Sequence, residues 1–243
     1  MAILIYSVNL LRISVVPFAQ DEGKQGAGAQ AAKEQGRADG QPDQTAFIYN
    51  TLNSIRTLVK VDPEQAQKTV YEFSTYLRSN LENVGERELI PFSDELRHIQ
   101  AYLNIEKVRF GERLRVAEDI GTKSFQVPPL SVQPLVENAV KHGICARMEG
   151  GTVTIRSREE ADAYVVEVED DGIGFEVESI EKRGKVSDKF SHIGLENIRF
   201  RIREIARGRL DIHSRPGEGT KVTVTFPKEE RKGDECHAGH DRG

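Results

Sequence analysis

A polar cluster near the middle of the chain has the residue types and spacing needed to hold a charged ligand. Within the stretch 133–143, Glu137, Asn138, Lys141 and His142 recur at spacings that a helix brings to one side. This arrangement offers a carboxylate, an amide and basic groups to a single ligand. Apolar residues occupy the other side, so an ordinary amphipathic helix with a solvated polar face is the alternative. We name these four residues the polar file.

Glycine-containing segments downstream of the polar file have the residue types of a ligand-binding backbone. Residues 170–174 (DDGIG) follow an alternating apolar run, residues 194–197 (GLEN) open a helical pattern, and residues 217–220 (GEGT) precede the last alternating run. Glycines at a strand end let a ligand approach the backbone closely, and a helix start offers N–H groups to phosphate. Taken singly, each segment could be a plain turn, helix start or hairpin.

The elements that must position these segments can be predicted between residues 112 and 227. Helical periodicity covers 133–143 and 193–206, and alternation of period two is typical of strands. The last two strands are expected to form a hairpin across 216–219. We therefore predict helices packed on one mixed sheet, with strands at 113–116, 153–157, 164–169, 210–213 and 221–226.

Residues 45–111 predict helices joined by short loops. Asp62 can cap a helix that begins at Pro63, where the missing N–H of proline costs nothing. Short connections make neighbouring helices antiparallel, and a spare apolar face would favour a dimer. The apolar positions at helical spacing are Ile48, Leu52, Ile55 and Val59, then Val70, Phe73, Leu77 and Leu81, then Leu96, Ile99, Leu103 and Phe110.

The two ends of the chain differ in composition from this centre. Residues 1–20 are mostly apolar and roughly at the lower limit of the ~17–25 residues of a membrane-spanning helix, but Arg12 interrupts them. They fit either a membrane segment or a docking terminus. Residues 21–44 indicate a flexible linker and residues 228–243 a disordered tail. Cys236-His237-x-x-His240 offers three metal ligands in that tail, where disorder is favoured over a metal site.

Charge and cysteine content exclude some classes of protein. The net charge is −5 and no basic block stands out among the 243 residues, so we expect no nucleic-acid partner. Cys145 and Cys236 make no disulfide framework, and both are expected to be free thiols.

Taken in order, these motifs resemble the GHKL superfamily of ATP-binding domains, in particular sensor histidine kinases of the LytS/YehU type. Residues 137–143 (ENAVKHG) are similar to its N box, and the three glycine segments to its glycine boxes. Residues 47–55 (FIYNTLNSI) resemble its phosphoacceptor helix, and 92–111 its second characteristic stretch. The resemblance implies an α+β fold, in which a helical hairpin for dimerisation and phosphotransfer (45–111) precedes a Bergerat α/β sandwich ATPase domain (112–227).

The resemblance also implies the cofactors ATP and Mg²⁺ and a role for each motif position. Glu137 would orient or deprotonate the attacking group and Asn138 would ligate Mg²⁺. Lys141 and His142 would offer positive charge to the phosphates. The lid over the phosphates would span about 177–193. The implied nucleotide-binding residues are Asn138, Lys141, His142, Asp170 for the adenine amino group, Gly172, Gly174, Gly194, Leu195, Asn197, Gly217, Gly219 and Thr220, which backs Asp170.

The chain departs from the family pattern at the position that matters most for phosphoryl transfer. Ala46 stands where the family has its phosphoacceptor histidine, and a methyl group cannot be a nucleophile. His98 is an alternative acceptor, but a solvated helix histidine is the favoured interpretation. His192 stands where the lid usually has its first glycine, and Asp171 where asparagine is more common.

Three functions follow as hypotheses. The first is the core of a two-component sensor histidine kinase that acts as a homodimer with a response regulator. Its catalytic region would be cytoplasmic, at the inner face of the bacterial membrane if residues 1–20 reach the bilayer. The second is a non-catalytic ATP-binding module that acts through a partner kinase or regulator. The third is an ATP-hydrolysing member of the superfamily, which the upstream helices disfavour.

Overall fold

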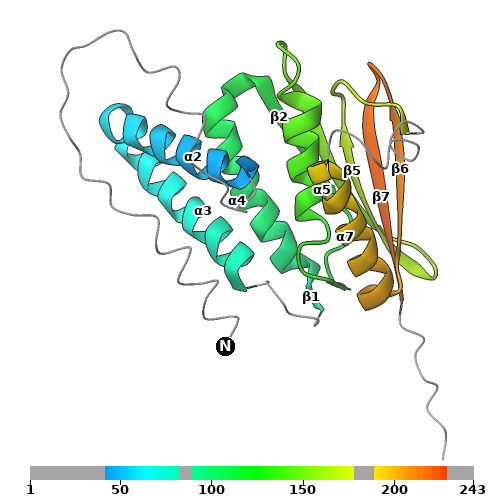
Figure 1. The fold of residues 1–243 in the computed structure, drawn as a ribbon. Coiled ribbons are helices and arrows are strands. Elements are labelled where there is room, and N and C mark those ends of the chain that lie inside the picture. Colours follow the sequence, from blue (N-terminus) through cyan, green and yellow to red (C-terminus); the bar gives the residue numbers. More distant parts are fainter. Residues whose placement is uncertain (1–41, 83–88, 178–188, 229–243) are drawn as a thin grey trace, which may run out of the picture. The chain divides into compact units, whose positions relative to one another are not determined.

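The computed structural model describes residues 42–82, 89–177 and 189–228 (Figure 1). The apolar segment 1–20, the linker up to residue 41, most of the expected lid and the Cys236–His240 cluster lie outside the described residues. Within the described ranges, no helix has both the length and the apolar character needed to cross a bilayer.

The first described elements are helices that pack on one another. Helix α2 (Pro42–Val61) and α3 (Pro63–Glu82) form a hairpin that contacts α4 (Phe92–Phe110) (Figure 1). The predicted cap is present, because Oδ1 of Asp62 accepts a hydrogen bond from the backbone N–H of Gln65 at 3.0 Å. The α2–α3 hairpin is therefore held against the helix that leads into the second half of the chain.

The packing of the hairpin corrects part of the predicted apolar stripes. The aromatic rings of Phe47, Phe73, Tyr76 and Tyr102 form the contact between α2, α3 and α4. In contrast, Val70 is 47% exposed and Val59 58% exposed. The hairpin packs on α4 along one face only, so apolar side chains on the opposite face stay uncovered in the single chain.

The predicted mixed sheet is confirmed. Its order is β2-β4-β5-β7-β6, in which β2 and β4 are parallel and the other pairs antiparallel. A second, two-stranded ladder of β1 (Ile90–Pro91) and β3 (Gln126–Val127) was not predicted. A 3₁₀ turn, η2 (Gly111–Arg113), leads into the main sheet. Its strands are β2 (Leu114–Ile120), β4 (Gly151–Glu159), β5 (Ala163–Asp170), β6 (Arg209–Arg215) and β7 (Gly219–Pro227).

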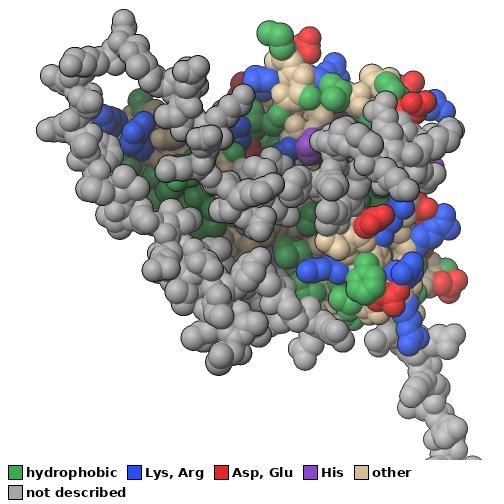
Figure 2. All heavy atoms as spheres, in the orientation of Figure 1, with side chains coloured by type: hydrophobic (Ala, Val, Ile, Leu, Met, Phe, Trp, Pro, Cys, Tyr) green, Lys and Arg blue, Asp and Glu red, His purple; other side chains and the backbone are tan. Residues whose placement is uncertain are grey.

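The two faces of this sheet have different partners. Helix α5 (Gln133–Asn138), the π-helical segment η3 (Ala139–Ile144) and α7 (Lys189–Ala206) cover one face, whose inward side chains are buried (Figure 1). The other face carries ion pairs, such as Glu167 with Lys221 at 2.8 Å. Acidic and basic side chains are also interspersed along the β6 edge (Figure 2). The predicted α+β fold, a helical part followed by an α/β sandwich, is confirmed.

Candidate functional site

The start of the helix that carries the polar file is fixed by a buried carboxylate from α4. Glu95, which is 0% exposed, accepts hydrogen bonds from the backbone N–H groups of Leu130 and Val132, both at 3.0 Å, and of Gln133 at 3.1 Å. Burial raises the pKa of Glu95, and the backbone N–H groups act against that shift. The first helical N–H groups thus have a partner, and α4 sets where α5 begins.

The helix changes its winding within the polar file, which the sequence analysis did not predict. Beyond Asn138 the backbone is π-helical, and the N–H of Cys145 donates to the carbonyl of Val140 at 2.8 Å. Single π-helical turns inside α-helices are frequent at functional sites. The predicted apolar side is confirmed, because Val132, Leu135 and Ala139 are buried.

Gly143, at the end of this helical stretch, brings the polar file to the first glycine segment. A Cβ atom on Gly143 would lie 2.4 Å from Oδ1 of Asp170, and a Cβ on Gly172 would lie 2.4 Å from Cα of Gly143. Both distances are too short for a side chain, so glycine is required at both positions. Segments about thirty positions apart in the chain therefore adjoin through backbone contact, as in a site for one ligand.

Asp170 is the buried carboxylate of the site. It ends β5, is 5% exposed, and its Oδ1 accepts the backbone N–H of Gly172 at 3.0 Å. Burial raises the pKa of Asp170 to about 6, whereas the N–H groups of Gly172 and Thr220 act to lower it and the neighbouring charge of Asp171 to raise it. Above that pH, Asp170 offers an ionised and buried hydrogen-bond acceptor.

The last glycine segment closes over the first one. The N–H of Gly217 donates to the carbonyl of Ile173 at 2.6 Å. Gly219 has a φ of +89°, and a Cβ there would lie 2.0 Å from the carbonyl oxygen of Asp170. Thr220 pairs with Asp170 across β5 and β7. We name the set Gly143, Asp170, Gly172, Gly174, Gly219 and Thr220 the glycine-rich site.

Ser214 belongs to this arrangement although the sequence analysis missed it. Its Oγ lies 3.0 Å from Oγ1 of Thr220 and accepts the N–H of Phe175 at 2.9 Å. The register of the final hairpin places Ser214 opposite Thr220. That register was the signal that could have revealed it.

Glu137 has partners from two elements. Its Oε1 accepts a hydrogen bond from Nε2 of Gln133 at 2.9 Å and from the hydroxyl of Tyr76 at 3.4 Å. Burial raises the pKa of Glu137, whereas Gln133, Lys141 and Tyr76 act to lower it. Gln133 stands one helical turn before Glu137 and could have been foreseen, but nothing in the sequence pointed to Tyr76.

The remaining predicted positions fall into two groups. Asn138 and Lys141 are half-buried beside Glu137, whereas His142 is exposed. On α7, Leu195 packs against the core and Asn197 is exposed. Gly194 lies inside α7, which begins at Lys189, earlier than the predicted start at residue 193. Residues 178–188 of the predicted lid lie outside the described residues.

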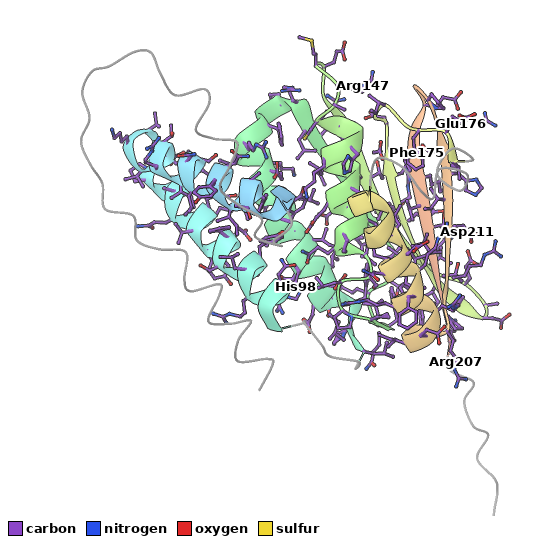
Figure 3. All side chains as sticks on the ribbon, viewed as in Figure 1. His98, Arg147, Phe175, Glu176, Arg207 and Asp211 are labelled. Atoms are coloured by element: carbon purple, nitrogen blue, oxygen red, sulfur yellow. The ribbon has the colours of Figure 1, made fainter. Side chains whose placement is uncertain are left out.

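Figure 3 places the alternative acceptor relative to the site. Phe175 and Glu176 lie on the segment that follows β5, whereas His98 lies on α4 well away from them (Figure 3).

Asp171 has a structural contact, because its Oδ1 accepts the N–H of Thr152 at 2.6 Å and its carbonyl accepts a hydrogen bond from Arg147. The aspartate that departs from the family pattern thus joins the end of β5 to β4.

The donors present fit a nucleotide with Mg²⁺. The glycines of the glycine-rich site let its backbone segments lie in direct contact, and the carboxylate of Asp170 can accept a hydrogen bond from an exocyclic amine. In the described part of the chain, no group of three or more His, Cys, Asp or Glu residues could hold a metal. Mg²⁺ usually binds through one or two protein oxygens together with substrate phosphates. The Asn138 amide oxygen can supply such a ligand.

Comparisons with known proteins find two matching family models and several relatives. The family described as histidine kinase matches residues 44–114, and the family described as histidine kinase-, DNA gyrase B- and HSP90-like ATPase matches residues 130–230. The uncharacterized protein YwpD of Bacillus subtilis is 37% identical over 190 residues, which cover 77% of this chain and 68% of YwpD. The sensor protein LytS of Bacillus anthracis is 36% identical over 190 residues, 75% of this chain and 32% of LytS.

The chain matches only part of the longer relatives. It spans about a third of the length of the LytS proteins that it matches. Among solved structures, the chain is similar to the catalytic domain of the histidine kinase ThkA, with 17% sequence identity and a TM-score of 0.47. The matched region covers 58% of this chain and 96% of the ThkA domain.

Proposed function

This chain belongs to the histidine kinase family, and from that premise we propose that it is an ATP- and Mg²⁺-binding sensor kinase core. In this proposal the machinery for phosphorylating a histidine is retained, but the chain has no acceptor at the usual position. The proposal concerns the part of a sensor kinase that this chain spans.

The observation that carries the proposal is the meeting of Gly143 with Asp170 and Gly172. Adenine is flat and has an exocyclic amine, so it suits a site of adjoining backbone segments with one buried acceptor. Asp170 would accept the hydrogen bond from that amine, supported by Thr220. Gly174, Gly217 and Gly219 would form the turn beside the base, and Gly194, Leu195 and Asn197 the start of α7 beside the phosphates.

The polar file would serve the phosphates. Asn138 would hold Mg²⁺, and Lys141 and His142 would add positive charge near the phosphate oxygens. When bound, Mg²⁺ neutralises charge on the phosphates, which lowers the barrier to phosphoryl transfer. Glu137 would orient the attacking group or accept its proton. Its burial supports this role, because a less hydrated carboxylate is a stronger base.

The acceptor position supports a second candidate function. Ala46 lies in α2 next to Phe47, whose ring centroid is 4.7 Å from that of Tyr76, and Tyr76 in turn contacts Glu137. Position 46 is thus adjacent in the chain to a residue that packs on Tyr76, but it is exposed and carries only a methyl group. A non-catalytic module, in which nucleotide binding acts on a partner kinase or regulator, is therefore the second candidate.

The partners proposed are a second copy of this chain and a response regulator or partner kinase. Tyr49, Leu52 and Val59 of α2 are 58%, 49% and 58% exposed, and their spacing places them on one helical stripe. A second α2 that covers this stripe would bury apolar surface on both copies. This supports a homodimer formed through the helical hairpin.

Calorimetry with ATP tests the proposal. We expect ATP to bind in the presence of Mg²⁺ and to bind more weakly after chelation, because the metal screens the phosphates from Glu137. Failure to bind ATP under both conditions would contradict the proposal. Steady phosphate release that Glu137→Ala abolishes would instead favour the ATP-hydrolysing hypothesis.

A further inference from the structure

We infer that Tyr76 is a positioning residue for Glu137, through which the α2–α3 hairpin holds the carboxylate in a fixed orientation. This rests on the proposed function of Glu137. The hydroxyl of Tyr76 donates to Oε1 of Glu137 at 3.4 Å, and Nε2 of Gln133 donates to the same oxygen at 2.9 Å. With both donors on Oε1, the other oxygen, Oε2, is the one assigned to the attacking group.

The ring of Tyr76 is itself held in place by packing. It is 3% exposed and packs against the rings of Phe47 and Tyr102, with centroid distances of 4.7 and 5.9 Å. A buried aromatic ring of this kind has one polar handle, and its packing decides where the hydroxyl points. The position of the hydroxyl therefore depends on how α2 and α4 pack around α3.

The hydroxyl of Tyr76 stays a hydrogen-bond donor in the charged surroundings of Glu137. The other titratable neighbours of Glu137 are Glu106 and Tyr102 of α4 and Lys141 of η3. Burial raises the pKa of Tyr76 well above its ordinary value, so its hydroxyl stays protonated at neutral pH. Glu137 thus receives a hydrogen bond from a helix that is remote in sequence and packs on α2, the helix that carries position 46.

The same contact connects the hairpin to the nucleotide side of the molecule. Phe47, which follows position 46, packs on the ring of Tyr76, and Tyr76 contacts Glu137 in the helix that ends at the glycine-rich site. A displacement of α2 relative to α3 would move the Tyr76 hydroxyl away from Oε1. The catalytic orientation of Glu137 would then depend on the conformation of the hairpin.

The test compares two tyrosine substitutions on the same helix in the A46H background, which supplies an acceptor. Tyr76→Phe keeps the packed ring and removes the donor, and Tyr71→Phe is the matched control, because Tyr71 is 71% exposed. We expect Y76F to lower the single-turnover phosphorylation rate about tenfold, with the Kd for ATP changed less than twofold. We expect Y71F to change neither. An unchanged rate in Y76F, or a rate loss matched by an equal loss of ATP affinity, overturns the inference.

A second measurement separates this inference from the proposed function. The measurement is the NMR chemical shift of the Glu137 side-chain carboxyl in the nucleotide-free chain labelled with ¹³C at glutamate. We expect this shift to change in Y76F and to stay unchanged in Y71F. If A46H takes up no phosphate, the proposed function fails, and the inference is judged on this signal alone. A Glu137 signal that is the same in wild type and Y76F overturns it.

Discussion

A Cβ atom on Gly143 would lie 2.4 Å from Oδ1 of Asp170, so the helix of the polar file and the buried carboxylate occupy adjoining positions. Gly143→Ala must displace Asp170 or the helix. We expect ATP affinity to fall at least about tenfold and the free energy of unfolding to fall by about 1–3 kcal/mol. Calorimetry and chemical denaturation measure the two effects.

Gly111→Ala is the control for this substitution. Gly111 has a φ of +55° and nothing within 4 Å of an added Cβ, so alanine there is strained without a clash. We expect a stability loss of about 1 kcal/mol and unchanged ATP affinity. Equal ATP affinity in G143A and wild type would show that the contact has no part in nucleotide binding.

Asp170→Asn removes the charge from the proposed adenine acceptor. A hydrogen bond to a charged group contributes about 1.5–3 kcal/mol, so we expect ATP affinity to fall about 10- to 100-fold. Nucleotide-free stability at pH 7 should not fall, because a buried carboxylate is replaced by a neutral group. Asp171→Asn is the matched control. Its amide oxygen can still accept the N–H of Thr152, so ATP binding should be kept.

The pH dependence of binding follows from the raised pKa of Asp170. A folded value of about 6 exceeds the ordinary 3.8, so this group stabilises the nucleotide-free fold most below pH 3.8, and that contribution is lost as pH rises through about 6. ATP affinity should change in the opposite direction, falling up to about tenfold per pH unit below 6, because the protonated carboxyl no longer accepts. Titrations of wild type and D170N between pH 5 and 7.5 measure this, since phosphate ionisation affects both. Parallel profiles would refute the assignment.

The parts of the fold that rest on strong local periodicity could be predicted from the sequence. The five strands of the main sheet and the helix cap at Asp62 arise from alternation and capping chemistry within a few residues. The β1–β3 ladder could not be predicted, because it pairs segments of only two residues. The exposure of Val70 was also missed, since periodicity defines a stripe but not which part of it a neighbouring helix covers.

Part of the site could likewise be predicted from the sequence, and part could not. Asp170, Gly172 and Thr220 follow from motif order, and the structure brings them together. The contact of Tyr76 with Glu137 joins residues 61 positions apart and leaves no local trace in the sequence. The role of Glu95 depends on its approach to a helix start far along the chain. Such contacts depend on tertiary packing, which no spacing rule encodes.

The exposed stripe of α2 predicts an effect on self-association. Leu52→Glu places a charge in the proposed dimer contact, so we expect the dimer dissociation constant to rise at least about tenfold. The fold of the single chain should be unaffected, because Leu52 is 49% exposed. Asn53→Glu adds the same charge at the neighbouring exposed position of α2 and should have a smaller effect. Sedimentation velocity compares them, and equal association of wild type and L52E would rule out this face.

Labelling with γ-labelled ATP and Mg²⁺ tests the central claim most directly, because it asks whether only the acceptor has been lost. The wild-type chain should bind ATP and gain no acid-labile label. The A46H variant should gain such label, and Glu137→Ala in that background should remove it. Acid-labile label on the wild-type chain, or none on A46H although it binds ATP, would contradict the account.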